Sequence, residues 1–279
     1  MTTKNDLLSF DYIRFIDHST MTNFNGAMHS FAIDDSLAIS VGDGASPPVT
    51  RLWVHDRTIV LGIADARLPY LKDGVNFLEQ QGYQVLIRNS GGLAVVLDQG
   101  VLNVSLIFPN AKKLDIHDAY GAMVQFIRQL FASEGMQIDA FEVKGSYCPG
   151  DFDLSIGGKK FAGISQRKVK DGTAVQIYLC VEGSGSERAQ FIKEFYKLGT
   201  KGEQTKFAYP TVKPETMSSL SELYNKTMTV EDVRNRILFE LQALSNKIVT
   251  DPLSSSEWAS FEKRLEYMEL RNEKALGSL

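Results

Sequence analysis

Cys148 lies in a segment whose composition favours a turn, Gly145-Ser-Tyr-Cys-Pro-Gly-Asp-Phe-Asp153. Glycine and proline around a cysteine are typical of loops, where the sulfur can be presented at a cleft instead of being packed in a core. A thiolate is a good nucleophile and forms thioesters readily. The segment therefore predicts an acyl-accepting nucleophile at Cys148, and the alternative is that this lone cysteine is a small buried hydrophobe.

A second candidate for chemistry is Lys160, in the segment Gly157–Gln166. A free cysteine has a pKa of about 8.5, so the site must stabilise a thiolate or supply a base. As an ammonium, Lys160 would stabilise the thiolate or an oxyanion, and as a neutral amine it would transfer a proton. Both roles stay open, beside the alternative of an exposed strand lysine. We expect Lys160 to face the cleft and Lys159 to point the other way, because strand side chains alternate.

Composition is that of an ordinary globular protein, with 279 residues, 43% hydrophobic, 23% charged and a net charge of −4. The mild acidity and the lack of an aromatic-basic repeat argue against nucleic-acid binding. The opening residues resemble no secretory leader and no apolar run is long enough for a membrane span, so we expect a cytoplasmic protein without membrane association. Cys148 and Cys180 form no ligand-spaced cluster, so neither a disulfide scaffold nor a metal site is expected. No cofactor is expected either. Four histidines without partner motifs are interpreted as structural or surface residues, namely His18, His29, His55 and His117.

The pattern of apolar residues alternates between helical and strand-like periods and predicts one α/β domain. Helices are expected at 28–41, 71–81, 119–131, 230–248 and 255–276. Strands are expected at 51–54, 58–63, 83–88, 93–97, 102–108, 153–156, 160–164 and 174–181, the last with Cys180 in the core. Gly157-Gly158 predicts a hairpin turn, Thr229 and Ser254 predict helix caps, and 199–214 reads as a polar loop. We expect a single domain over 1–279 with a helical extension at about 215–279 packed on it, or alternatively a separate small domain.

The strings Arg88-Asn-Ser-Gly-Gly-Leu-Ala-Val-Val-Leu-Asp-Gln-Gly-Val-Leu-Asn-Val-Ser105 and Gly158-Lys-Lys-Phe-Ala-Gly-Ile-Ser-Gln166 resemble the lipoate-protein ligase and lipoyl/octanoyltransferase family. The resemblance covers roughly residues 25–200. Within that family, the string around Cys148 is most similar to the cysteine-dependent octanoyl-[glycine cleavage H protein]:protein N-octanoyltransferases. The implied fold is α/β (α+β), with a mixed, mostly antiparallel central sheet flanked by helices, as in class II synthetases and biotin ligases. Family ligases typically have a third glycine and a His-Asp pair where this chain has Leu93 and Leu97-Asp98, which disfavours an ATP-dependent reaction.

The resemblance implies that octanoyl passes from a lysine of the octanoylated H protein to Cys148, and then to a lysine of a lipoyl domain of oxoacid dehydrogenase E2 subunits. The alternatives are an octanoyl-[acyl carrier protein] transferase, an ATP-dependent lipoate ligase and a noncatalytic lipoyl-domain binding module. The implied substrate-binding residues follow the two family strings: Arg88, Ser90, Gly91, Gly92, Asp98, Asn103, Ala162 and Gly163.

For several other residues the resemblance implies a functional role, and an ordinary structural position is the alternative. Leu93, Val95 and Ala162 would form the wall of an apolar slot for the acyl chain, or else belong to the sheet core. Arg167, Lys168 and Lys170 would form a docking patch for acidic lipoyl domains, or else a solvated turn.

Overall fold

The computed structural model of the chain describes residues 7–20 and 26–277, so the segment 1–6, which bears on the expectation about a leader, lies outside it. Its centre is an eight-stranded sheet in the order β11-β1-β2-β6-β10-β9-β8-β7. These strands are β1 (Phe10–His18), β2 (Val49–Trp53), β6 (Val101–Phe108), β7 (Asp139–Ala140), β8 (Leu154–Ile156), β9 (Lys159–Val169), β10 (Gly172–Cys180) and β11 (Ser245–Val249). Strand β1 runs parallel to β11 and β2, and the other ladders are antiparallel. The predicted mixed, mostly antiparallel sheet is confirmed.

A smaller sheet stands beside the large one, in the order β4-β3-β5. Its strands are β3 (Thr58–Leu61), β4 (Gln84–Ile87) and β5 (Val95–Leu97). The chain leaves β4 at Arg88 and returns at β5, so the glycine-containing segment 88–94 is held at both ends by this sheet. Residues of these strands share one hydrophobic cluster with the helices α2 (Leu71–Gln80) and α4 (Gly185–Thr200).

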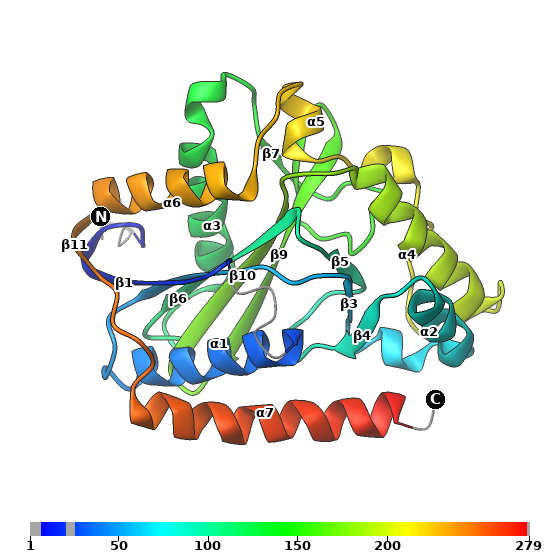
Figure 1. Cartoon of the computed structure of the whole chain (residues 1–279), viewed down its shortest axis with the longest axis horizontal. Coiled ribbons are helices and arrows are strands. Elements are labelled where there is room, and N and C mark those ends of the chain that lie inside the picture. Colours follow the sequence, from blue (N-terminus) through cyan, green and yellow to red (C-terminus); the bar gives the residue numbers. More distant parts are fainter. Residues whose placement is uncertain (1–6, 21–25, 278–279) are drawn as a thin grey trace.

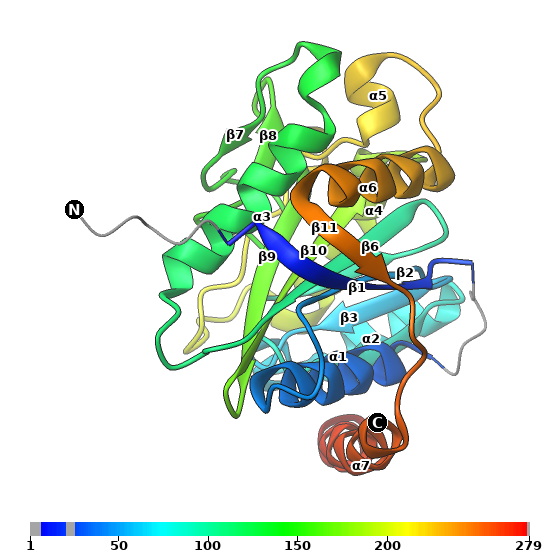
Figure 2. The same ribbon diagram turned by 90° about the vertical axis from the view of Figure 1, so that its left-hand side faces the viewer.

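Helices cover both faces of the large sheet (Figures 1 and 2). On one face α1 (Ala27–Gly42) packs on the strands and α7 (Ser255–Leu276) packs on α1, whereas α3 (Ile116–Leu130) and α6 (Val230–Leu244) lie on the other face. The position of α1 between sheet and α7 explains why even its polar residues Asp34, Asp35 and Ser36 are buried. The short helix α5 (Leu220–Tyr224) and three single turns, Asp65–Arg67, Ala132–Glu134 and Pro214–Thr216, complete the structure.

The predicted helices and strands are found at the expected places, with two kinds of difference. The expected helix 230–248 ends at Leu244, because Ser245–Val249 is extended and pairs with β1, which provides backbone partners that the local sequence does not reveal. Strands β1 and β7 and helices α4 and α5 were not predicted at all. Within the part of the chain that the structure describes, no helix is long and apolar enough to cross a membrane.

The predicted turns and caps are confirmed. Gly157 and Gly158 both have positive φ, 57° and 78°, as the two central residues of a tight hairpin between β8 and β9 require. Ser254 and Glu257 form the capping box of α7, and Glu257 also binds the buried guanidinium of Arg14 at 2.8 Å. The cap of the last helix thereby connects it to strand β1.

Candidate active site

Cys148 occupies a strained position in the loop between β7 and β8. Its φ of 45° lies in the left-handed region, which costs a residue other than glycine about 1–3 kcal/mol. The Nζ of Lys160 donates hydrogen bonds to the carbonyl oxygens of Cys148, at 2.8 Å, and of Tyr147, at 2.9 Å. Lys160 therefore holds the backbone on which the cysteine is presented.

Lys160 lies beneath this loop and does not face the cleft, which corrects the expectation from the sequence. Its side chain is fully buried and forms an ion pair with Asp153 at 2.8 Å. Burial raises the pKa of Asp153, and the neighbouring ammonium acts in the opposite direction. Lys159 is exposed on the other side of the strand, as the alternation of side chains predicts.

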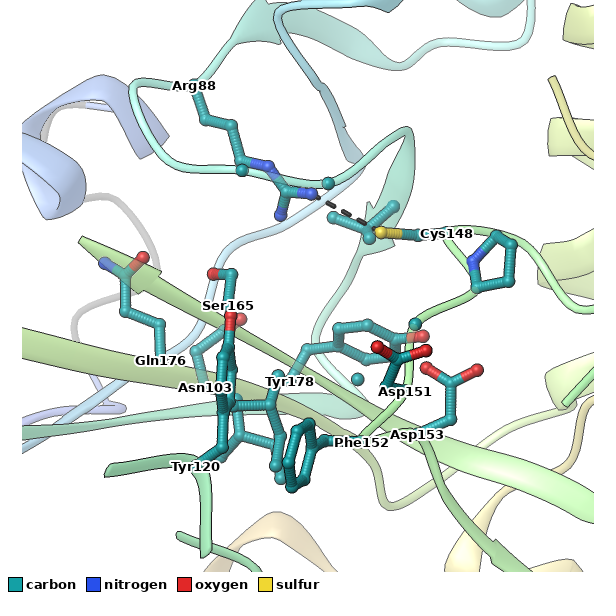
Figure 3. A pocket seen from close by; sticks show the side chains of 18 of the residues that line it. Arg88, Asn103, Tyr120, Cys148, Asp151, Phe152, Asp153, Ser165, Gln176 and Tyr178 are labelled. Atoms are coloured by element: carbon teal, nitrogen blue, oxygen red, sulfur yellow. Dashed lines mark hydrogen bonds between the residues drawn. The ribbon is translucent and has the colours of Figure 1, made fainter. Parts of the chain in front are cut away.

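The sulfur of Cys148 is directed at the segment that leaves the small sheet. The backbone N–H of Leu93 donates to Sγ at 3.1 Å, and Nη2 of Arg88 lies 3.5 Å from Sγ (Figure 3). Arg88 also donates to the carbonyl oxygen of Leu93 at 2.9 Å, which fixes the guanidinium beside the sulfur. The segment that opens the first family string and the cysteine loop thus meet at the Cys148 sulfur.

A cavity of about 360 Å³ opens beside this sulfur, which is within the range of small-molecule sites. Aromatic side chains from distant parts of the chain form much of its wall. Tyr120 of α3 stacks on Phe152 of the cysteine loop, with ring centroids 4.9 Å apart. The ring of His117 is tilted against that of Phe152, with centroids 5.8 Å apart. The apolar and aromatic lining residues are Phe31, Trp53, Val95, Leu97, Ile116, Tyr120, Phe152, Ile164, Ile177 and Tyr178.

A buried polar network stands behind the cavity. Arg51 is fully buried and pairs with Asp34 at 2.8 Å, and Asp34 accepts hydrogen bonds from Ser105, at 2.5 Å, and Gln176, at 2.6 Å. Ser105 in turn accepts from the indole N–H of Trp53. Trp53 and Gln176 both line the cavity, so this network fixes the orientation of part of its wall.

The structure brings together some of the predicted substrate-binding residues. Arg88, Gly91, Gly92, Asn103 and Gly163 line the cavity with Cys148. Position 163 requires glycine for a steric reason, because a Cβ there would lie 2.7 Å from the ring of Tyr178.

The other predicted substrate-binding residues lie elsewhere. Asp98 is not in the lining and binds Arg188 at 2.7 Å, since both belong to the junction between β5 and α4. Ala162 and Ser90 are buried outside the lining, and within the described residues the Ser90 hydroxyl has no hydrogen-bond partner. Of the residues expected in the wall of the slot, Val95 is in the lining, whereas Leu93 supplies its N–H to the sulfur.

The basic cluster of the sequence is engaged in contacts within the chain. Arg167 binds Asp35 at 2.7 Å, Lys168 donates to the carbonyl oxygens of Ala111 and Leu114, and Lys170 lies 3.6 Å from Asp43. Its role in docking stays a prediction.

Several site residues could not be found from the sequence. Phe31, Trp53, Tyr120 and Gln176 lie outside the family strings, whereas Phe152 stands inside the string around Cys148. His117, interpreted as a structural or surface residue, lies at the cavity wall. His18 is half-buried and His55 is buried, and burial lowers the pKa of each to about 4.

This arrangement can form a thioester. It offers a sulfur nucleophile, an N–H and a guanidinium beside it, and an apolar space for a chain attached to the reacting carbonyl. Among the described residues there is no cluster of three or more acidic, histidine or cysteine side chains suited to a metal ion.

Comparison with known proteins gives the same family on independent grounds. The octanoyl-[GcvH]:protein N-octanoyltransferase of Oceanobacillus iheyensis is 54% identical over 272 residues, covering 96% of this chain and 98% of that protein. The enzyme of that name from Staphylococcus aureus is 49% identical over 267 residues, covering 95% of each. A solved structure of lipoate-protein ligase A bound with ATP shares the fold, with a TM-score of 0.71 at 16% identity over 97% of this chain and 100% of that one. The lipoyl protein ligase A/B catalytic-domain profile matches residues 27–242, and the chain belongs to that family.

Proposed function

We propose that this protein is an octanoyl-[glycine cleavage H protein]:protein N-octanoyltransferase. One observation carries the proposal beyond the family: the Cys148 sulfur lines the apolar cavity and accepts a backbone N–H at 3.1 Å. A strained cysteine held in this way favours a catalytic protein over a noncatalytic binding module. The names of the relatives, which cover nearly the whole chain, support the same activity.

The reaction is an exchange of one amide for another through a thioester. The Cys148 thiolate attacks the carbonyl carbon of octanoyl-lysine, a C–S bond forms, and the π pair of the carbonyl moves to its oxygen. Collapse of this intermediate breaks the C–N bond, and the donor lysine takes a proton from the solvent and leaves as an amine. The acceptor lysine then attacks the thioester, gives up a proton to the solvent and releases the thiolate. Because an amide is broken and an amide is formed, no ATP is consumed.

The octanoyl chain is proposed to lie in the cavity beside Cys148. Burying seven carbons at about 0.8 kcal/mol each would contribute roughly 5–6 kcal/mol, enough to prefer octanoyl over short acyl groups. The aromatic wall formed by Trp53, Tyr120, Phe152 and Tyr178 provides the apolar surface for this burial.

The donor is proposed to be the octanoylated H protein, and the acceptors to be lipoyl domains of oxoacid dehydrogenase E2 subunits, in the cytoplasm. Lys160 is proposed to act through the cysteine loop, because its Nζ binds two carbonyl oxygens of that loop and a carboxylate. In this role the lysine stabilises the strained backbone of the nucleophile.

The test is intact-mass analysis of the protein mixed with octanoylated H protein and an unmodified lipoyl domain, without ATP. The expected result is a hydroxylamine-sensitive octanoyl adduct on Cys148 and gain of octanoyl by the lipoyl domain. Cys148→Ala is expected to form no adduct and to transfer nothing, whereas Cys180→Ala, at a fully buried core position, serves as the matched control. Transfer only from octanoyl-carrier protein would replace the donor, transfer only with ATP and free acid would favour a ligase, and full transfer by Cys148→Ala would exclude the thioester.

A further inference from the structure

Both hydrogen-bond partners of the Cys148 sulfur are donors. The N–H of Leu93 points at Sγ from 3.1 Å and a guanidinium N–H of Arg88 from 3.5 Å. A backbone N–H and a guanidinium can donate hydrogen bonds but cannot accept them. A thiol proton therefore gains nothing from either partner, whereas a thiolate gains from both.

Gly92 gives independent support, because it leaves the space in which sulfur and guanidinium meet. A Cβ at this position would lie 2.2 Å from Nη2 of Arg88 and 2.9 Å from Sγ of Cys148. Both distances are far below van der Waals contact, so any side chain would push the two groups apart. The backbone at Gly92, with φ of 98°, also requires glycine.

Lys160 is a second cation near the cysteine, but its hydrogen bonds go to other acceptors. Its Nζ is bound to the carboxylate of Asp153 at 2.8 Å and to the carbonyl oxygens of Tyr147 and Cys148. An ammonium has three hydrogens to donate, and these acceptors account for all three. Lys160 thus positions the loop and has no hydrogen left for the sulfur.

We infer that Arg88 is a catalytic residue: its guanidinium, together with the N–H of Leu93, binds the Cys148 sulfur as a thiolate and holds it ready for attack. When the sulfur lone pair forms the C–S bond, the negative charge passes to the carbonyl oxygen, and the cation is already beside the reacting atoms. The inference deepens the proposed function and rests on it only for the acyl step. The contact of the guanidinium and the N–H with the sulfur belongs to the protein without any acyl donor.

The test measures alkylation of Cys148 by iodoacetamide across pH 5 to 10, because the thiolate is the reacting species. Peptide mass spectrometry assigns the modified cysteine. Arg88→Gln is expected to lower the rate at pH 7 about tenfold, which corresponds to about 1.4 kcal/mol, and to move the rise of the rate toward higher pH. Arg88→Lys, which keeps a charge but not the planar guanidinium, is expected to fall between the two. Arg264→Gln, on the distant helix α7, is the matched control and should behave as the wild type.

An unchanged alkylation profile in Arg88→Gln, or in Arg88→Lys and Arg88→Ala if the first variant does not fold, would overturn the inference. So would a larger loss of alkylation in Lys160→Met than in Arg88→Gln at equal folded fraction. The two claims fail separately, since no acyl donor is present in this assay. Slow alkylation of the Arg88 variants with no octanoyl transfer by the wild type would sink the proposed function alone.

Discussion

Gly92→Ala is the most direct perturbation of the contact between sulfur and guanidinium. Alanine at positive φ costs about 1–2 kcal/mol in the folded state. Its Cβ, 2.2 Å from Nη2, must also displace Arg88, which breaks the hydrogen bond of 2.9 Å to the carbonyl oxygen of Leu93 and the contact with Sγ. Hydrogen bonds of charged groups contribute about 1.5–3 kcal/mol. If this loss falls on the transition state, octanoylation of Cys148 slows roughly 10- to 150-fold.

The assay is single-turnover octanoylation of Cys148, followed by intact mass, with urea unfolding measured in parallel. Gly202→Ala is the matched control, because Gly202 has a similar φ of 76° but no atom within 4 Å of an added Cβ. Both variants are expected to lose about 1–2 kcal/mol of unfolding free energy, but only Gly92→Ala should lose activity. The reasoning is refuted if Gly92→Ala is acylated at the wild-type rate, or if Gly202→Ala loses as much activity.

Three further predictions concern stability. Lys160→Met should lower the unfolding free energy in urea by about 3–5 kcal/mol, because it leaves the buried Asp153 carboxylate unpaired, and Lys160→Met/Asp153→Leu should recover most of this loss. Burial and the neighbouring Arg51 lower the pKa of His55 in the folded protein to about 4. The contribution of neutral His55 to the free energy of unfolding is therefore complete above pH 6.5 and is lost as the pH falls from there through about 4. This loss, on the order of 3 kcal/mol, should be absent from the pH profile of His55→Gln. Asn272→Ala should cost about 1–3 kcal/mol and speed hydrogen exchange at Ile87, whose backbone N–H and C=O are both bound by the Asn272 amide.

Each of these predictions has an outcome that contradicts it. A loss below 1 kcal/mol in Lys160→Met would mean that the ion pair is not the main partner of the carboxylate. An equally steep acid profile in His55→Gln would assign the pH dependence to other groups. Unchanged exchange at Ile87 would show that α7 does not hold the edge of β4, and Asn246→Ala, an exposed amide on β11, is the control for that measurement.

The sequence was sufficient where the signal is local. The turn at Cys148 follows from its glycine and proline neighbours, the hairpin from Gly157-Gly158, and the limits of α7 from the cap at Ser254. These features depend on backbone preferences over a few residues, so a single chain reveals them.

What the sequence could not reveal depends on contacts between distant segments. The direction of Lys160 is set by which face of β9 meets the cysteine loop, and this is decided only when Asp153 closes over it. Asp98 stands next to a glycine turn, yet its partner Arg188 is 90 positions away. Residues 245–249 read as the continuation of a helix because the strand they pair with, β1, lies at the other end of the described chain.

That last pairing has a consequence for how the chain folds during synthesis. Asn246 of β11 and Asp11 of β1 are joined by a hydrogen bond across 235 positions. At about 5–20 residues per second, a ribosome needs roughly 12–47 s to make the intervening chain. For that time one edge of β1 stays unpaired and open to strands of other chains. The strands β2, β6, β9 and β10 that line the cavity all precede residue 181 and can pair earlier. Slow or interrupted translation should therefore produce aggregates seeded at the β1 edge.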